Sequence, residues 1–312
     1  MTRAFIFPGQ GSQVVGMGKE LADAYPLARE VFEEVDEALN RNLSKLIFEG
    51  PEEELTLTEN AQPAIMATSV AIMRVLSVVG GFDLAREASH VAGHSLGEYS
   101  ALAVAGAFSL SDAARILRSR GRAMQAAVPL GEGAMAVFMG LSLDDADAVA
   151  EEAANYGVCD FANDNAPGQV VVSGSKISIE KAIVLAIKKG ARRAVMLPVS
   201  APFHCALMAP AADVLSEVLS EIVMENPIVP IVSNVIAEAV TDAGRIRELL
   251  VEQVTGRVRW RECVLAMKDA GVSEFIEIGA GKVLSGLVRR IDRDLIVSNV
   301  DTPEDVVAFF KV

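Results

Sequence analysis

Short apolar segments alternate with amphipathic segments along almost the whole chain of 312 residues. Apolar segments such as 4–7 and 90–93 are typical of strands that are buried on both faces of a sheet. Amphipathic segments such as 62–79 and 112–127 predict helices that cover those faces, and Pro63 fits the first turn of the former. The pattern predicts an α/β fold on a parallel central sheet.

The pattern changes in the middle of the chain, which indicates an inserted subdomain. Between Pro129 and Pro198, predicted strands and helices follow the order β-α-β-α-β. A unit of this kind can close a small sheet of its own. We therefore expect residues 129–198 to form a small subdomain and residues 1–128 and 199–312 to form a large one.

Composition limits the partners of the chain. Hydrophobic residues make up 51% and charged residues 22%, as in an ordinary soluble globular protein, and the net charge of -14 opposes binding to nucleic acid or to an anionic membrane. The N-terminal apolar segment is too short for a signal peptide, and no apolar run approaches the ~20 residues of a membrane span. The cysteines Cys159, Cys205 and Cys263 form neither a disulfide framework nor a C-x-x-C zinc motif. We expect a cytoplasmic protein.

Residues 93–97 read Gly-His-Ser-Leu-Gly, a G-x-S-x-G motif between a predicted strand and a predicted helix. In that context, glycines on both sides of Ser95 allow the sharp turn of a nucleophile elbow, and the helix N-terminus directs its amides toward the hydroxyl. The alternative is a glycine-flanked turn with an inert serine. We favour the nucleophile.

A serine nucleophile needs a general base, and the chain contains three histidines. His90 lies too far back along the strand, and His94, the neighbour of Ser95, should point away from it. His204, in a loop after the insert, is therefore the candidate base, although an isolated loop histidine is often merely solvated. The H-x-x-x-H spacing of His90 and His94 predicts no metal site, because the two side chains diverge on a strand and turn.

Arg120 falls within the apolar stripe of its predicted helix. A guanidinium on the buried face requires an anion, because burial of an unpaired charge is costly. The anion is either a carboxylate of this chain or the carboxylate of a substrate held by two hydrogen bonds. The stripe consists of Ala113, Ile116, Leu117, Ala123, Met124 and Ala127.

The glycine-rich loop after the first strand is not a nucleotide-binding loop. Gly9 and Gly11 begin a G-x-G-x-x-G pattern, but Val14 stands where its third glycine belongs, and no phosphate-binding G-x-x-x-x-G-K-[ST] occurs in the chain. No cofactor is expected. The exposed amides near Gln10 suit one half of an oxyanion hole, with the amide of Leu96 as the other half.

Six sequence blocks occur in order over nearly the whole chain: FPGQGSQ at 7–13, QPA at 62–64, GHSLGEYSA at 93–101, Arg-Gly at 120–121, NAPGQVV at 165–171 and PVSAPFHCALM at 198–208. With these blocks the chain resembles the bacterial malonyl-CoA:acyl carrier protein transacylases of fatty-acid synthesis. The family implies an α/β-hydrolase-like large subdomain with a ferredoxin-like insert. It implies Ser95 as the acylated nucleophile, His204 as the base, Arg120 as the clamp on the malonyl carboxylate, and the amides of Gln10 and Leu96 as the oxyanion hole.

The resemblance also implies positions around the substrate. A backbone carbonyl at Arg259 would orient the histidine, at a position that many relatives fill with glutamine. Phe203 would crowd a branch at the substrate α-carbon and so favour malonyl over methylmalonyl groups. Asp164 departs from the apolar residue that some relatives carry there. The remaining implied substrate-binding residues are Gln62, Met124 and Asn165.

The implied reaction is a ping-pong transfer of malonyl from malonyl-CoA to the phosphopantetheine thiol of holo acyl carrier protein. Separately from the resemblance, we expect a monomer. A serine esterase or thioesterase with the same elbow is the alternative, although no acid is evident behind the histidine, and a non-catalytic carrier-protein scaffold is a third interpretation. Because carrier proteins are acidic, docking would use a basic cluster, either 188–193 or Lys282 with Arg289 and Arg290. Each cluster could equally be a solvated charge run.

Overall fold

The computed structural model describes residues 2–311, and its central sheet is parallel except at one edge. The strand order is β10-β9-β1-β2-β7-β8, and only β8 runs antiparallel to its neighbour among these strands. The prediction of a parallel central sheet is confirmed. The strands are β1 (Arg3–Phe7), β2 (Ala88–Gly93), β7 (Ile231–Val232), β8 (Ala239–Val240), β9 (Glu274–Ile278) and β10 (Ile296–Val300).

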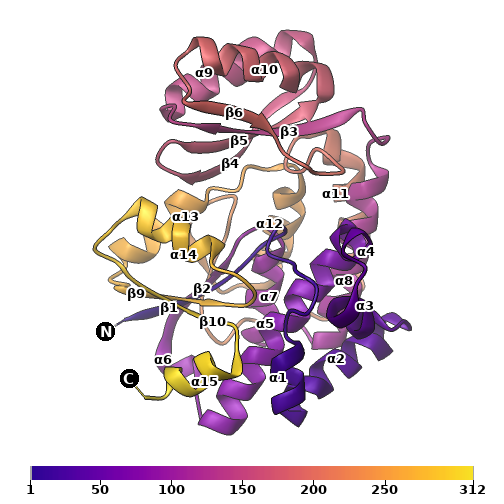
Figure 1. Cartoon of the computed structure of the whole chain (residues 1–312), viewed down its shortest axis with the longest axis vertical. Coiled ribbons are helices and arrows are strands. Elements are labelled where there is room, and N and C mark those ends of the chain that lie inside the picture. The colour runs from indigo at the N-terminus through magenta and orange to yellow at the C-terminus, as the bar shows by residue number, and fades with distance from the viewer. Residues whose placement is uncertain (1, 312) are drawn as a thin grey trace.

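Helices cover both faces of this sheet (Figure 1). Alternate residues of β1 show the two faces: Phe5 and Phe7 belong to one hydrophobic core, and Ala4 and Ile6 to another. The helices of the large subdomain are α1 (Lys19–Ala24), α2 (Pro26–Leu39), α3 (Leu43–Glu49), α4 (Glu52–Thr56), α5 (Thr58–Gly80), α6 (Leu84–Glu87), α7 (Leu96–Val104), α8 (Leu110–Ala126), α11 (Ala209–Ser220), α12 (Ala243–Thr255), α13 (Trp260–Asp269), α14 (Val283–Ile291) and α15 (Pro303–Phe309), with a 3-10 turn at Ala206–Met208.

The long helix α5 differs from its prediction at the N-terminal end. It begins at Thr58, so Pro63 lies inside the helix and not in its first turn. Helix α5 is long and apolar enough to cross a membrane by composition, but 72% of its most apolar window is buried inside the protein. Such burial is that of a central core helix, and α5 packs against α2, α7 and α8.

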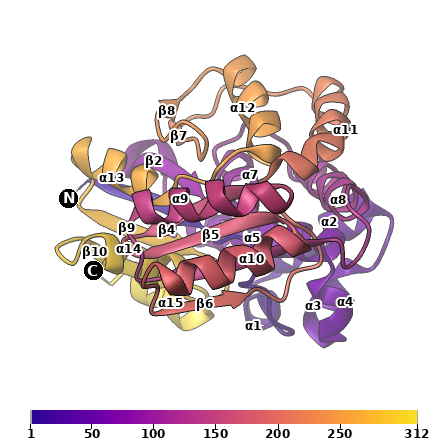
Figure 2. The same cartoon turned by 90° about the horizontal axis from the view of Figure 1, so that it is seen from above.

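A second sheet lies across one end of the molecule, with two helices on its outer face (Figures 1 and 2). Its order is β4-β5-β3-β6 with all neighbours antiparallel, which is the arrangement of a ferredoxin-like β-α-β-β-α-β unit. All four strands come from within the predicted insert. The elements are β3 (Gly133–Met139), α9 (Leu143–Ala153), a 3-10 turn (Ala154–Tyr156), β4 (Cys159–Ala166), β5 (Gln169–Ser175), α10 (Lys176–Lys188) and β6 (Arg193–Met196).

Strand β4 is absent from the strands predicted from apolar runs, because Asp and Asn residues occupy much of its second half. These polar side chains attach the small sheet to the large subdomain. The amide of Asp164 donates to the carbonyl of Val258, and its buried carboxylate accepts hydrogen bonds from Arg261 at 2.8 and 3.1 Å. Asp164 therefore fixes the end of β4, including Asn165, over the large sheet.

Candidate active site

Ser95 occupies the sharp turn between β2 and α7. Its φ of 54° and ψ of -107° are strained for a residue with a side chain. The flanking glycines permit this turn, because a Cβ on Gly93 would lie 1.9 Å from the carbonyl carbon of Gly97, and a Cβ on Gly97 would lie 2.1 Å from the carbonyl oxygen of Phe7. The local structure is that of a nucleophile elbow.

The structure brings Ser95 and His204 together from sequence positions that are 109 residues apart. Ser95 Oγ and His204 Nε2 lie 2.8 Å apart, and His204 Nδ1 lies 2.8 Å from the carbonyl oxygen of Gln253. An Nδ1–H that donates to this carbonyl leaves the lone pair of Nε2 free to accept the serine proton.

The prediction that Arg259 supplies the orienting carbonyl is wrong. Gln253 lies in the last turn of α12, where carbonyl groups have no partner within the helix and are free to accept from His204. Arg259 lies just before α13, and its guanidinium pairs with Glu262. Gln253 is itself a glutamine ahead of Trp260, the residue type that many relatives carry at the orienting position, so the resemblance contained the signal and the prediction placed it at the wrong residue.

The pKa of His204 is lowered to about 3 by burial, and the positive charge of Arg120 acts in the same direction. The imidazole is therefore neutral at physiological pH and able to accept a proton. Its second nitrogen faces a carbonyl and not the carboxylate of a complete triad.

Arg120 extends from α8 into the same site, with 2% of its surface exposed. Its Nη1 donates to Gln62 Oε1 at 2.8 Å, and its Nη2 lies 3.1 Å from Ser95 Oγ and 3.0 Å from Gln253 Oε1. Within residues 2–311, no carboxylate forms a salt bridge with this guanidinium. A carboxylate of this chain as its direct partner is therefore excluded for the described residues.

The amides of Gln10 and Leu96 border the site and, in the described part of the chain, donate to no other group. They belong to a cavity of about 560 Å³ that also holds every other predicted site residue except Arg259. Phe203 is buried at its wall, and Met124 Sδ lies 3.8 Å from Gln62 Nε2. The predicted residues in the cavity are Gln10, Gln62, Ser95, Leu96, Arg120, Met124, Asn165, Phe203 and His204.

Two further residues of the site were missed at the level of sequence. His94 also lines the cavity, where its Nε2 lies 2.8 Å from Asn165 Oδ1. Asn234 holds the backbone of the elbow on both sides of His94. Its Oδ1 accepts from the amide of Ser95 at 2.7 Å, and its Nδ2 donates to the carbonyl of Gly93 at 2.8 Å. Asn234 follows β7 and has no motif around it that could have identified it.

Comparison with known proteins gives one consistent family. Residues 4–301 match the family model described as acyl transferase domain. The malonyl CoA-acyl carrier protein transacylase of Bacillus subtilis is 47% identical over 304 residues, which cover 97% of this chain and 94% of that protein. The crystal structure of an acyl-carrier-protein-S-malonyltransferase from Bartonella henselae matches with a TM-score of 0.98 and 53% identity, over 100% of this chain and 99% of that one. A malonyl-transacylase in complex with a holo type II PKS acyl-carrier protein matches with a TM-score of 0.96 and 43% identity, over 100% of this chain and 99% of that one.

Proposed function

The chain belongs to the acyl transferase family, and from this membership and the geometry of its site we propose that it transfers the malonyl group of malonyl-CoA to holo acyl carrier protein. The reaction feeds fatty-acid synthesis. The observation that carries the proposal is the buried guanidinium of Arg120, which lies 3.1 Å from Ser95 Oγ and has no carboxylate partner within residues 2–311. A malonyl group on Ser95 would supply the missing anion.

In the first half-reaction, Ser95 Oγ attacks the thioester carbonyl while its proton moves to His204 Nε2. The amides of Gln10 and Leu96 stabilise the oxyanion, since neither has another partner within residues 2–311. Collapse of the tetrahedral intermediate breaks the carbon–sulfur bond, and the imidazolium returns its proton to the leaving CoA sulfur. The product is a malonyl ester on Ser95.

In the second half-reaction, the phosphopantetheine thiol of the carrier protein gives its proton to His204 and attacks the ester. The bond to Ser95 Oγ breaks, and the serine oxygen recovers the proton. Phe203, at the cavity wall, favours malonyl over a branched methylmalonyl group by steric exclusion. Gln62 contributes by holding Arg120 at Nη1.

An acceptor-dependence assay tests this function. With malonyl-CoA alone, we expect CoA release to stop once Ser95 is acylated, and we expect it to continue when holo acyl carrier protein is added. Release of CoA and a thiol-linked malonyl group on the carrier are measured together. Continuous release of CoA and free malonate without an acceptor would instead identify a hydrolase.

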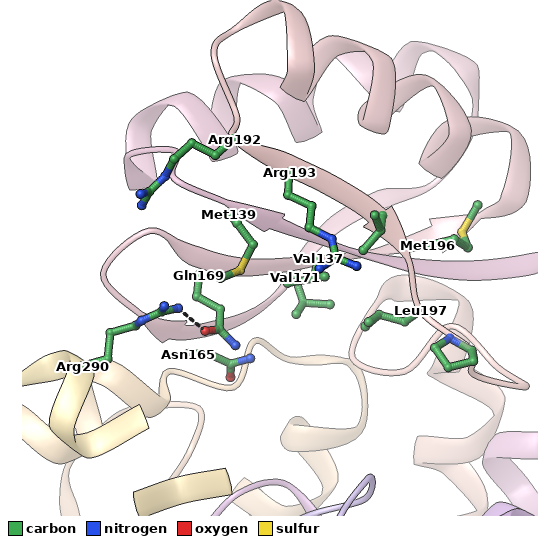
Figure 3. A pocket seen from close by; sticks show the side chains of 12 residues that line it. Val137, Met139, Asn165, Gln169, Val171, Arg192, Arg193, Met196, Leu197 and Arg290 are labelled. Carbon is green, nitrogen blue, oxygen red and sulfur yellow. Dashed lines mark hydrogen bonds between the residues drawn. The ribbon is translucent and has the colours of Figure 1, made fainter. Parts of the chain in front are cut away.

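The carrier protein is acidic, and we propose that it docks at a basic cavity beside the site. This cavity, of about 740 Å³, lies under the small sheet. It shares Asn165, Val171, Leu197 and Pro198 with the active-site cavity. Figure 3 shows Arg193 pointing under the sheet, while Arg290 reaches in from the large subdomain and donates to Gln169 at 2.6 Å. The fold therefore brings Arg192 and Arg193 of one predicted basic cluster and Arg290 of the other to one place. In the described chain, Arg192 and Arg193 have neither an ion pair nor a hydrogen bond from their guanidinium groups.

Replacement of both Arg193 and Arg290 by alanine should raise the KM for carrier protein roughly tenfold, because charges at the rim of an interface mainly govern association. Transfer to free pantetheine should change little, since that acceptor lacks the acidic protein surface. Steady-state kinetics with both acceptors at low and high salt measure the difference. Lys188→Ala, which removes an exposed charge of the same cluster away from the cavity, is the matched control. Equal losses with both acceptors would contradict docking here.

We also propose that the protein acts as a cytoplasmic monomer. A nucleophile, its base, a buried cation and two free amides line one cavity within the chain, so the proposed chemistry requires no second copy. The cysteines Cys159, Cys205 and Cys263 are free and buried, which suits a reducing compartment. Light scattering of the purified protein tests the monomer, since a stable dimer would double the measured mass.

A further inference from the structure

Glu98 is a buried carboxylate beneath the nucleophile elbow that the reaction described above does not use. It lies in the first turn of α7 with 1% of its surface exposed. Its Oε2 accepts hydrogen bonds from Gln253 Nε2 at 2.8 Å and from the amide of Asn234 at 3.1 Å. Its Oε1 is buried and has no hydrogen-bond partner within residues 2–311.

The two partners of Glu98 are the residues that hold the reacting groups. Gln253 Nε2 points to Glu98 and to the carbonyl of Ser95, which turns its Oε1 toward Arg120. The backbone carbonyl of Gln253 orients His204. Asn234 accepts from the amide of Ser95. Glu98 is the nearest of the acceptors that turn Gln253 Nε2 away from Arg120, ahead of the carbonyl of Ser95 at 3.1 Å and Asn234 Oδ1 at 3.4 Å.

Charge links Glu98 to Arg120 as well. Burial raises the pKa of Glu98 to about 7, while hydrogen bonds from Asn234 and Gln253 and the charge of Arg120 oppose that rise. Of the neighbouring titratable groups, Tyr99 on α7 and Cys263 on α13 stay neutral because burial raises the pKa of each. His204 is neutral because burial lowers its pKa to about 3. The positive charge nearest to Glu98 among these groups is thus that of Arg120, and the Gln253 side chain bridges the two residues.

We propose that Glu98 is a positioning residue for malonyl transfer, which fixes the Gln253 amide and, when ionised, balances the charge of Arg120 in the enzyme that carries no acyl group. This inference rests on the proposed function. Two negative charges would then flank one cation in the malonyl enzyme, so the ionised Glu98 opposes malonyl binding. An uncharged acyl group experiences no such opposition.

Glu98→Gln separates charge from hydrogen bonding, because glutamine keeps an oxygen acceptor for Gln253 and Asn234. We expect the KM for malonyl-CoA to fall about fivefold and the preference for malonyl over acetyl to rise, as expected for loss of a nearby like charge. Glu98→Asp keeps the charge but withdraws the acceptor. It should lower kcat for both acyl groups, because the Gln253 side chain is then no longer fixed against Arg120, whose guanidinium lies 3.1 Å from Ser95 Oγ.

The matched control is Glu277→Gln. Glu277 is also a buried glutamate, but it accepts from the amides of Leu284 and Ser285 at the start of α14, outside the active-site cavity. Its replacement should leave the KM for malonyl-CoA unchanged.

Intact mass of the wild-type protein after incubation with malonyl-CoA tests the underlying function independently. If no malonyl ester forms on the wild-type protein, the proposed function fails, whatever the Glu98 variants do.

The wild-type protein offers a second measurement that needs no variant. As the pH rises from 6 to 8, Glu98 ionises, so the ratio of the KM for malonyl-CoA to the KM for acetyl-CoA should rise. The ratio cancels ionisation of CoA itself. If the wild-type protein forms the malonyl ester but the ratio of the two KM values does not change between pH 6 and 8, the charge balance is overturned. An unchanged KM for malonyl-CoA in a folded Glu98→Gln protein would overturn it as well. An unchanged kcat in folded Glu98→Asp would overturn the positioning role.

Discussion

A Ser95→Ala protein should take up no malonyl group from malonyl-CoA, and transfer to carrier protein should fall by a factor of at least about 10⁴, as on loss of a catalytic nucleophile. The hydroxyl removed is the one that lies 2.8 Å from His204 Nε2, and no other serine hydroxyl in the described chain contacts that imidazole. Intact-mass analysis after incubation with malonyl-CoA measures the ester, and thiol-linked malonyl on the carrier measures the transfer.

Ser100→Ala is the control for that experiment. Ser100 is a fully buried serine on α7, the helix that follows Ser95, and within residues 2–311 its hydroxyl has no hydrogen-bond partner. Its replacement should leave malonyl uptake at the wild-type level. Detection of a stoichiometric malonyl ester on the Ser95→Ala protein would place the nucleophile elsewhere and remove the basis of the mechanism.

The sequence predicts those site residues that depend on local backbone geometry or that are selected from very few candidates of the required type. Ser95 was predictable because glycines on both sides, between a strand and a helix, permit few turns other than an elbow. His204 followed from the small number of histidines, and Arg120 from its place on the apolar face of α8. In each case the alternatives were physically costly and therefore few.

The parts that sequence could not reveal depend on contacts between distant segments. Gln253 serves through a backbone carbonyl, which every residue has, so apart from the family's glutamine the position of the end of α12 selects it. Asn234 serves through an amide that meets the elbow from 139 residues away. Strand β4 was missed because its polar residues pair with the large subdomain, as Asp164 does with Arg261, and so interrupt the apolar pattern.

Arg120→Ala should lower kcat/KM for malonyl-CoA roughly 100- to 1000-fold, the loss expected when one partner of a buried charge pair is removed, and should change acetyl transfer far less. The malonyl carboxylate would enter a buried site without its cation, whereas an acetyl group carries no charge to be compensated. The ratio of the two kcat/KM values is the measurement, because it cancels general damage to Ser95 and His204.

Two further variants separate the charge of Arg120 from its other contributions. Arg120→Gln keeps part of the side-chain volume and a donor for Gln62 or Gln253 but lacks the charge, so it should lose the malonyl preference as Arg120→Ala does. Arg115→Ala removes an exposed arginine from the same helix and should leave the preference intact. Because Arg120 also lies 3.1 Å from Ser95 Oγ, both acyl groups are expected to lose some rate in either Arg120 variant. A malonyl-to-acetyl ratio that stays at the wild-type value in both would show that the guanidinium supports the serine and does not select the acid.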